Sequence, residues 1–302
     1  MPLRLRNFFS RQRGDGVSHA RYEDWIGDPP PVKSMPSVIP VTSCLCRQGD
    51  FALDAYRYWM AQIRVAPMFH RKLWEYYFIS QALYEAGMLQ EGRCGLVFGA
   101  GQERLPALYA AWGCDIVITD QADEAAQRDG WVETGQHSSN LELLNSHGIC
   151  DSEQFRRRAS FKIVDMNAIP ESLSNFDFCW STCSFEHLGS LAHGLDFVEN
   201  SLNTLVPGGV AVHTTEFNLS SNSNTFESPG LSLYRRSDIE RLINRLQAQG
   251  HTVSPVNWSS GMGKLDRYID LPPFAWREPH LKLKILQYEI TTIGLIIRKR
   301  PA

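Results

Sequence analysis

The sequence lacks the features that mark several classes of protein. It has no apolar run near the roughly 20 residues that a membrane helix needs. The basic start, residues 1–14, has no apolar core of the kind found in signal peptides. A formal net charge of only −3 argues against a chain that binds nucleic acid as a whole. These absences favour a globular protein of the cytoplasm.

Paired cysteine motifs are also missing. The seven cysteines are scattered and include no Cys-x-x-Cys pair. An odd number of isolated cysteines is typical of free thiols in a reducing compartment. A zinc site would require residues distant in the sequence to converge, and no carboxylate cluster in the sequence demands a divalent cation. We therefore expect metal-independent chemistry.

The stretch from Leu96 to Gln121 is the most informative part of the chain. An apolar run, residues 96–98, predicts a buried strand and is followed by the turn Gly99-Ala100-Gly101. A helix and a second strand follow, with Asp120 at the end of that strand. In open parallel sheets, ligands bind outside the carboxyl ends of the strands. The stretch therefore predicts a nucleoside site, although an ordinary strand-turn-helix with no ligand remains the alternative.

The glycine turn lacks the third glycine of the dinucleotide fingerprint. Glu103-Arg104 occupies the place where that glycine is expected. A carboxylate at the start of a helix would repel a pyrophosphate. NAD and FAD are therefore disfavoured, and a nucleoside without phosphates is favoured.

The first 90 residues divide into an arm and a helical segment. Residues 1–42 are rich in proline and start with basic residues, which predicts either a surface arm or a weak contact with an anionic membrane surface. Residues 43–90 contain aromatic side chains at helical spacing, and Pro67 divides them into two helices. This segment is expected to form a packing layer or a lid over the ligand.

After residue 121, strands and helices alternate. The expected strands are residues 161–164, 176–180, 210–215, 251–256 and 287–299, with helices near 139–146, 152–158, 191–205 and 236–249. Insertions are expected at about 131–158 and 257–287. This alternation predicts an α/β, doubly wound Rossmann-like sheet. No crossover helix precedes the last strand, which should therefore run antiparallel.

Two further motifs make the pattern resemble a known family. Asp165-Met166 follows the third strand, and Pro207-Gly208-Gly209 leads into the fifth. Together with the glycine turn and Asp120, these motifs resemble the class I S-adenosylmethionine-dependent methyltransferases. The resemblance covers about residues 91–302 and implies a seven-stranded sheet whose last strand is antiparallel.

The resemblance implies roles for particular residues. Asp120 would bind the ribose hydroxyls, and Asp165 would accept from the adenine amino group. Two positions depart from the family pattern, because Val97 replaces its acidic residue and Glu103 its third glycine. The full set of implied contacts to S-adenosylmethionine is Gly99, Gly101, Asp120, Asp165, Met166 and Ser181.

The segment after the fourth strand suggests the kind of acceptor. Glu186-His187 resembles the small-molecule branch of the family, and no amide-methylating motif stands at that place. Transfer to a hydroxyl needs a general base, for which histidine is the usual choice. His187 and His213 are the candidates, each with a structural role as the alternative. Glu216 follows His213 on the acceptor side, and His280 lies in the second insertion.

These patterns together predict a methyltransferase that acts on a hydroxyl of a sugar, glycan or polar metabolite. One alternative is N-methylation of a small amine, with Glu186 or Glu216 holding the ammonium group. The other is a non-catalytic nucleoside-binding subunit, since Val97 and Glu103 depart from the pattern.

Overall fold

The computed structural model describes residues 22–27, 32–35, 40–129, 137, 141–274 and 278–302. The basic start of the predicted arm, residues 1–14, lies outside these ranges, as does most of residues 130–140. Within the ranges that are described, no helix is both long and apolar enough to span a lipid bilayer.

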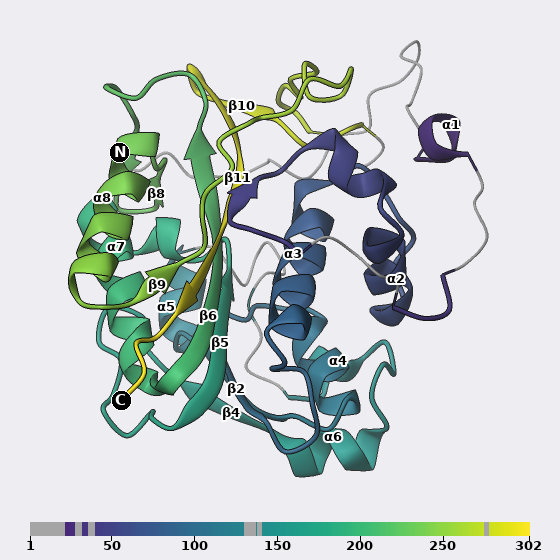
Figure 1. Cartoon of the computed structure of the whole chain (residues 1–302), viewed down its shortest axis with the longest axis vertical. Helices are drawn as coiled ribbons and strands as arrows, with labels where there is room; N and C mark the ends of the chain where they lie inside the picture. The colour runs from purple at the N-terminus through teal and green to yellow at the C-terminus, as the bar shows by residue number, and fades with distance from the viewer. Residues whose placement is uncertain (1–21, 28–31, 36–39, 130–136, 138–140, 275–277) are drawn as a thin grey trace.

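A mostly parallel sheet forms the centre of the molecule (Figure 1). Its main path runs in the order β1-β11-β6-β5-β2-β3-β4, and β9 and β10 also pair with β11. The strands are β1 (Cys44–Leu45), β2 (Cys94–Phe98), β3 (Asp115–Asp120), β4 (Ala159–Ile163), β5 (Phe176–Thr182), β6 (Leu205–Asn218), β9 (Thr252–Val253), β10 (Leu283–Ile285) and β11 (Tyr288–Arg298). A short hairpin, β7 (Glu227–Ser228) with β8 (Leu231–Ser232), lies apart from this sheet.

The strand directions confirm the predicted fold class. Strands β2, β3, β4, β5 and β6 pair in parallel, whereas β11 runs antiparallel to β6 along Ile290–Arg298. β9 is antiparallel to β11 and therefore has the direction of the parallel set. This is the Rossmann-like arrangement with a reversed last strand that the sequence predicts.

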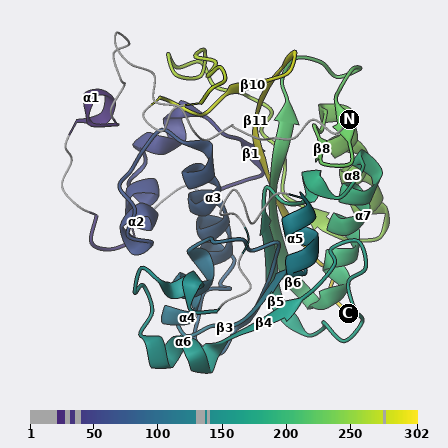
Figure 2. The same ribbon diagram turned by 180° about the vertical axis from the view of Figure 1, so that it is seen from behind.

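Helices cover both faces of the sheet. In Figures 1 and 2, α2, α3, α4 and α6 lie on one side, and α5, α7 and α8 lie on the other. The helices are α1 (Tyr22–Ile26), α2 (Asp54–Gln62), α3 (Arg71–Glu85), α4 (Leu105–Ala111), α5 (Asp123–Asp129), α6 (Ser152–Arg158), α7 (Leu191–Ser201) and α8 (Arg236–Ala248), with 3-10 turns η1 (Gln48–Ala52), η2 (Leu143–Asn145), η3 (Phe185–His187) and η4 (Leu202–Thr204).

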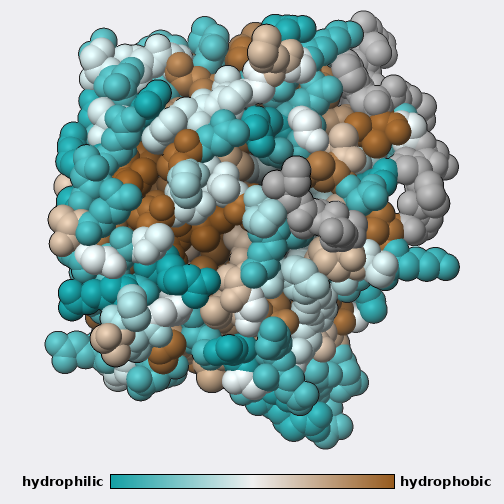
Figure 3. All heavy atoms as spheres, in the orientation of Figure 1, coloured by the Kyte–Doolittle hydropathy of each residue, from teal (hydrophilic) through white to brown (hydrophobic). Residues whose placement is uncertain are grey.

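Each helical layer has its own apolar core. Trp74 and Phe78 of α3 pack with Trp180 of β5 on one face, while Phe197 of α7 and Leu242 of α8 pack on the other. Figure 3 shows apolar side chains gathered between α8 and the central strands, on a face that is otherwise mostly polar.

The segment 43–90 is built into the sheet and its core. β1 pairs with β11 at Cys44↔Gly294 and Leu45↔Ile293. α3 crosses the same region so closely that a Cβ added at Gly294 would lie 2.3 Å from the Phe78 ring. The segment therefore shares one core with the strands of the site.

Several predicted boundaries differ from the structure. β6 begins at Leu205 and so includes the Pro-Gly-Gly motif, whereas β9 is only two residues long. Pro255 follows β9 and has no N–H to continue the ladder. The described part of 139–146 forms the turn η2 in place of the predicted helix.

Candidate active site

The glycine turn follows β2 as the sequence predicts. Gly99 and Gly101 have φ angles of +60° and +53°, which side chains with a Cβ rarely adopt. A Cβ added at Gly99 would lie 2.8 Å from Ser184 Oγ and 3.3 Å from Met166 Sδ. Glycine is therefore needed at this position of the turn, where the backbone comes close to Ser184 and Met166.

Asp120 holds this turn from the neighbouring strand. Its Oδ2 accepts from Gly101 N at 2.9 Å, and its Oδ1 accepts from Gln121 N at 2.8 Å. The His137 ring lies beside it, with Nδ1 3.6 Å from Oδ2, and His137 Nε2 contacts Asp123 at 2.7 Å. Burial raises the pKa of the Asp120 carboxyl, while the two backbone N–H groups and His137 oppose that rise.

Asp165 and Met166 lie beside the same turn. Asp165 is exposed, and its Oδ1 accepts from Asn167 N at 2.8 Å. Met166 is buried, with its sulfur directed toward Gly99. The ends of β2, β3 and β4 thus bring together the glycine turn and both carboxylates that the sequence assigns to a nucleoside.

Ser181 and His213 occupy a different place from the one expected. Ser181 Oγ lies 2.8 Å from His213 Nδ1, and Ser201 Oγ lies 3.1 Å from His213 Nε2. The His213 ring is fully buried against Phe185 and Phe197, and this burial lowers its pKa to about 3. Residues alternate between the two faces of a strand, so both side chains point toward α7, away from Glu216.

This placement differs from two sequence-based expectations. His213 belongs to the core, and we assign it a structural role in place of general base. Ser181 is an interior strand residue, and Ser184 lies at the turn instead, where its Oγ donates to Gly99 O at 3.2 Å. Because β5 ends at Thr182, Ser181 lies within the strand and Ser184 lies in the loop that approaches the glycine turn.

A buried charged cluster lies at the carboxyl ends of β5 and β6. Its centre is Glu75 of α3, which is fully buried and contacts Arg71 at 3.4 Å and Lys72 at 2.9 Å. Burial alone would raise the pKa of Glu75, but Lys72 and Arg71 outweigh burial and lower it. Thr292 Oγ1 also donates to Glu75, at 3.0 Å.

Three more side chains complete this cluster: one just beyond β5, one in η3 and one in β6. Glu216 accepts from Arg71 Nη2 at 2.5 Å, Glu186 accepts from Thr215 at 3.0 Å, and Cys183 Sγ donates to Glu75 at 3.1 Å. Burial raises the pKa of the Glu186 and Glu216 carboxyls, against the effect of the nearby cations. The sequence-predicted Glu216 therefore lies in a group of carboxylates.

His187 follows Glu186 in η3 and is half-buried. Its Nδ1 lies 2.7 Å from Gly230 O, an atom that only accepts, so Nδ1 carries the proton. Its Nε2 lies 3.9 Å from Glu186 Oε1. Burial lowers the pKa of this imidazole. The structure thus places His187 beside the carboxylates.

Glu103, which replaces the expected third glycine, is buried between the two parts of the site. It accepts from Trp180 Nε1 at 2.6 Å and from Thr182 Oγ1 at 2.5 Å. Burial raises its pKa to about 7. The departure from the glycine pattern thus introduces a buried, hydrogen-bonded carboxyl group.

The second insertion reaches the same region. His280 Nδ1 lies 2.6 Å from Asp270 Oδ2, and the His280 ring stacks on His70 with centroids 4.7 Å apart. His280 O accepts from Arg71 N at 3.0 Å, which ties the insertion to the start of α3. Figure 1 shows the insertion and β10 at the end of the molecule where the β6 arrow ends.

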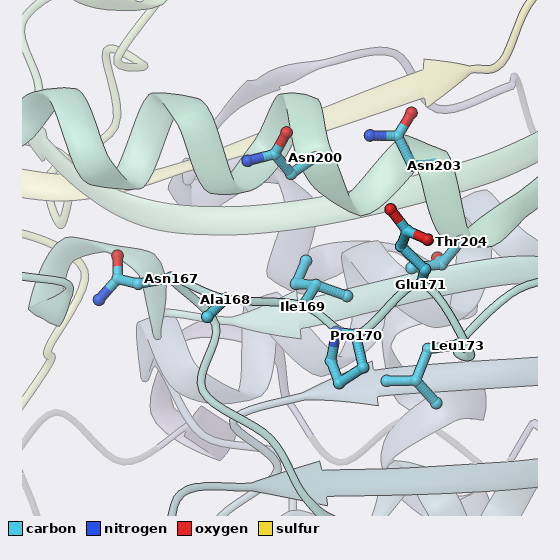
Figure 4. A pocket seen from close by; sticks show the side chains of 9 residues that line it. All are labelled: Asn167, Ala168, Ile169, Pro170, Glu171, Leu173, Asn200, Asn203 and Thr204. Atoms are coloured by element: carbon cyan, nitrogen blue, oxygen red, sulfur yellow. The ribbon is translucent and has the colours of Figure 1, made fainter.

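A separate groove of about 400 Å³ lies between the loop after β4 and α7 (Figure 4). Asn167, Ile169 and Leu173 line one side, with Asn200 and Asn203 on the other. The groove does not include the glycine turn, Asp120 or the buried carboxylates, so we assign the chemistry elsewhere.

Comparison with known proteins gives likeness in structure alone. No protein-family model and no curated protein matches the chain. It is similar to TehB from Haemophilus influenzae (12% identity, 82% of this chain and 67% of that one, TM-score 0.47). It is also similar to an S-adenosylmethionine-dependent methyltransferase from Clostridium acetobutylicum (11%, 74% and 89%, 0.44) and to DhpI in its complex with SAH (13%, 72% and 81%, 0.41). The likeness concerns the fold.

Arg71, Lys72 and Glu75 are not among the site residues that the sequence predicts. The sequence does contain a pattern that could have indicated them, since three charged residues at helical spacing lie among the aromatic residues of α3. Such a face is either a solvated stripe or a buried network, and the sequence alone does not distinguish the two.

Proposed function

We propose that the protein is an S-adenosylmethionine-dependent methyltransferase that acts on a hydroxyl of a small polar acceptor, such as a sugar or polar metabolite. The observation that carries this proposal is the convergence of the glycine turn, Asp120 and Asp165-Met166 at one edge of the sheet. These residues fit a nucleoside without phosphates, because the turn leaves room where a Cβ would collide and supplies carboxylates for hydroxyl and amino groups.

The acceptor is assigned to the ends of β5 and β6. S-adenosylmethionine supplies a methyl group on a sulfonium, and an acceptor oxygen displaces it in line. Glu216 and His187 lie at this edge, and we assign them to the acceptor side. Arg71 orients Glu216 by donating a hydrogen bond to it, and Glu75 orients Cys183 by accepting one from it. The proposed acceptors include a hydroxyl group of a glycan.

A second candidate is transfer to an amine. The buried carboxylates Glu186 and Glu216 favour it, because an ammonium group donates several charge-assisted hydrogen bonds. Mass spectrometry of products formed from acceptor mixtures and labelled S-adenosylmethionine distinguishes the two, since O-methyl and N-methyl products fragment differently.

The test of the cofactor site is calorimetric titration with S-adenosylhomocysteine. We expect micromolar binding by the unaltered protein and at least tenfold weaker binding by Asp120→Ala, about 1.4 kcal/mol or more. Asp177→Ala is the matched control, because Asp177 accepts from a backbone N–H at the opposite edge, Cys94 N at 2.8 Å. Equal affinities of the two variants would show that Asp120 is not part of the site. Absence of binding by the unaltered protein would refute the proposed cofactor.

A further inference from the structure

Three side chains from two strand ends converge in the buried cluster. Cys183, Glu186 and Glu216 each place a possible ligand atom within 4.8 Å of the other two. Cys183 lies just beyond β5, Glu186 in η3, and Glu216 in β6. The sulfur and two carboxylates thus surround one point at the carboxyl edge of the sheet.

Both carboxylates have an oxygen left over. Glu186 is 0% exposed and Glu216 is 6% exposed. Thr215 and Arg71 bond one oxygen of each, but Glu186 Oε1 and Glu216 Oε2 have no hydrogen-bond partner within the described part of the chain. Leaving a buried acceptor unsatisfied is unfavourable, and more so for a charged group. Two such oxygens in one cluster indicate a missing partner.

The charges of the cluster point to a cation. Three carboxylates, those of Glu75, Glu186 and Glu216, face two cationic side chains, Arg71 and Lys72. Arg71 and Lys72 contact Glu75 and one oxygen of Glu216, whereas no cationic side chain contacts the second oxygen of Glu216 within the described residues. A cation between Glu186 and Glu216 would supply that contact.

The backbone fixes the thiol in this position. Cys183 has a φ angle of +47°, which non-glycine residues rarely adopt. Its N–H donates to Thr214 O and lies within reach of Thr214 Oγ1, each at 3.1 Å. The chain therefore holds Cys183 in an unfavourable conformation that directs its sulfur toward the carboxylates.

We propose that Cys183, Glu186 and Glu216 bind a divalent transition-metal ion of the zinc class. A thiolate selects zinc or cobalt over magnesium and calcium, and carboxylate oxygens complete the ligand set. Three protein ligands leave a fourth position open, as in catalytic zinc sites. That position adjoins the acceptor side, where an ion would also bind an acceptor oxygen. The inference does not depend on S-adenosylmethionine binding.

The test uses the full chain, freed of metal by a chelator and titrated with Co²⁺. We expect one Co²⁺ per chain, a near-ultraviolet sulfur-to-cobalt absorption band, and displacement of that band by Zn²⁺. Cys183→Ser should lose the band, and Glu186→Gln and Glu216→Gln should each weaken Co²⁺ binding at least tenfold. Circular dichroism checks that each variant is folded.

Cys94→Ser is the matched control, because Cys94 is a half-exposed free thiol at the start of β2. It should keep the band and the affinity. Absence of the band in the unaltered protein, or its persistence in Cys183→Ser, would overturn the inference. Calorimetry with S-adenosylhomocysteine on the same samples reports the cofactor site separately, so each proposal can fail without the other.

Discussion

At the scale of single residues, strand alternation decides what each polar side chain does. Thr182 donates to Glu103 near the site, while Ser181, its neighbour, points to the opposite face and meets His213. The same alternation separates His213 from Glu216 on β6. A polar residue near a strand end is thus functional or structural according to the face on which it lies.

His213 provides a direct test of this distinction. We expect His213→Ala to lower the free energy of unfolding by about 2–4 kcal/mol, because it opens a cavity and leaves the Ser181 and Ser201 hydroxyls without this partner. S-adenosylhomocysteine affinity and turnover per folded molecule should stay within twofold. Urea unfolding and calorimetry measure these quantities.

His193→Ala is the control for that substitution, because His193 is exposed on α7. Its effect on stability should stay within about 0.5 kcal/mol. A large loss of turnover in His213→Ala with unchanged stability would restore His213 as a catalytic residue.

The sequence predicts the part of the site that is local in the chain. The glycine turn and Asp120 fall within one stretch of β2, α4 and β3, and their spacing alone indicates their proximity. The cluster of Glu75, Glu186 and Glu216 joins three distant segments, and no spacing in the sequence indicates that they converge. β1 is equally hidden, because two residues carry no periodic signal.

At the scale of elements, α3 carries half of the charged cluster and rests on β11. Gly294 allows this contact, since a Cβ there would lie 2.3 Å from Phe78. The position of Arg71 and Glu75 relative to Glu216 therefore depends on how closely α3 approaches the sheet.

Gly294→Ala should move α3 outward. We expect a loss of about 1–3 kcal/mol in the free energy of unfolding, as overpacked cores show. Turnover should fall by tenfold or more, while S-adenosylhomocysteine affinity changes less than threefold, because the glycine turn lies on β2. Gly49→Ala is the control, since a Cβ there meets nothing within 4 Å. If Gly294→Ala lost S-adenosylhomocysteine affinity and turnover to the same extent, the cofactor site would also depend on the position of α3, contrary to this prediction.

At the scale of the whole molecule, buried acids make stability depend on pH. Glu103 is 4% exposed, and burial raises its pKa from the ordinary 4.5 to about 7. The folded protein holds this proton more tightly than the unfolded chain does. The stabilisation is therefore complete below about pH 4.5 and is lost as the pH rises to about 7, a change on the order of 3 kcal/mol.

Glu103→Gln should remove this loss while keeping bonds to Trp180 and Thr182. We expect the variant to gain stability relative to the unaltered protein between pH 5 and pH 8, as measured by urea unfolding at both values. Glu153→Gln, at an exposed position on α6, should leave the pH profile unchanged. Parallel profiles for Glu103→Gln and the unaltered protein would show that Glu103 does not titrate in this range.

The pairing of β1 with β11 also sets an order of events during synthesis. Ser43 Oγ accepts from Ile296 N across 253 residues of chain. The ribosome releases the early segment first, when the strand that it joins has not yet been translated. The aromatic side chains of α3 therefore cannot be fully buried until β11 has been translated. Until then the nascent chain exposes this apolar surface, to which chaperones can bind.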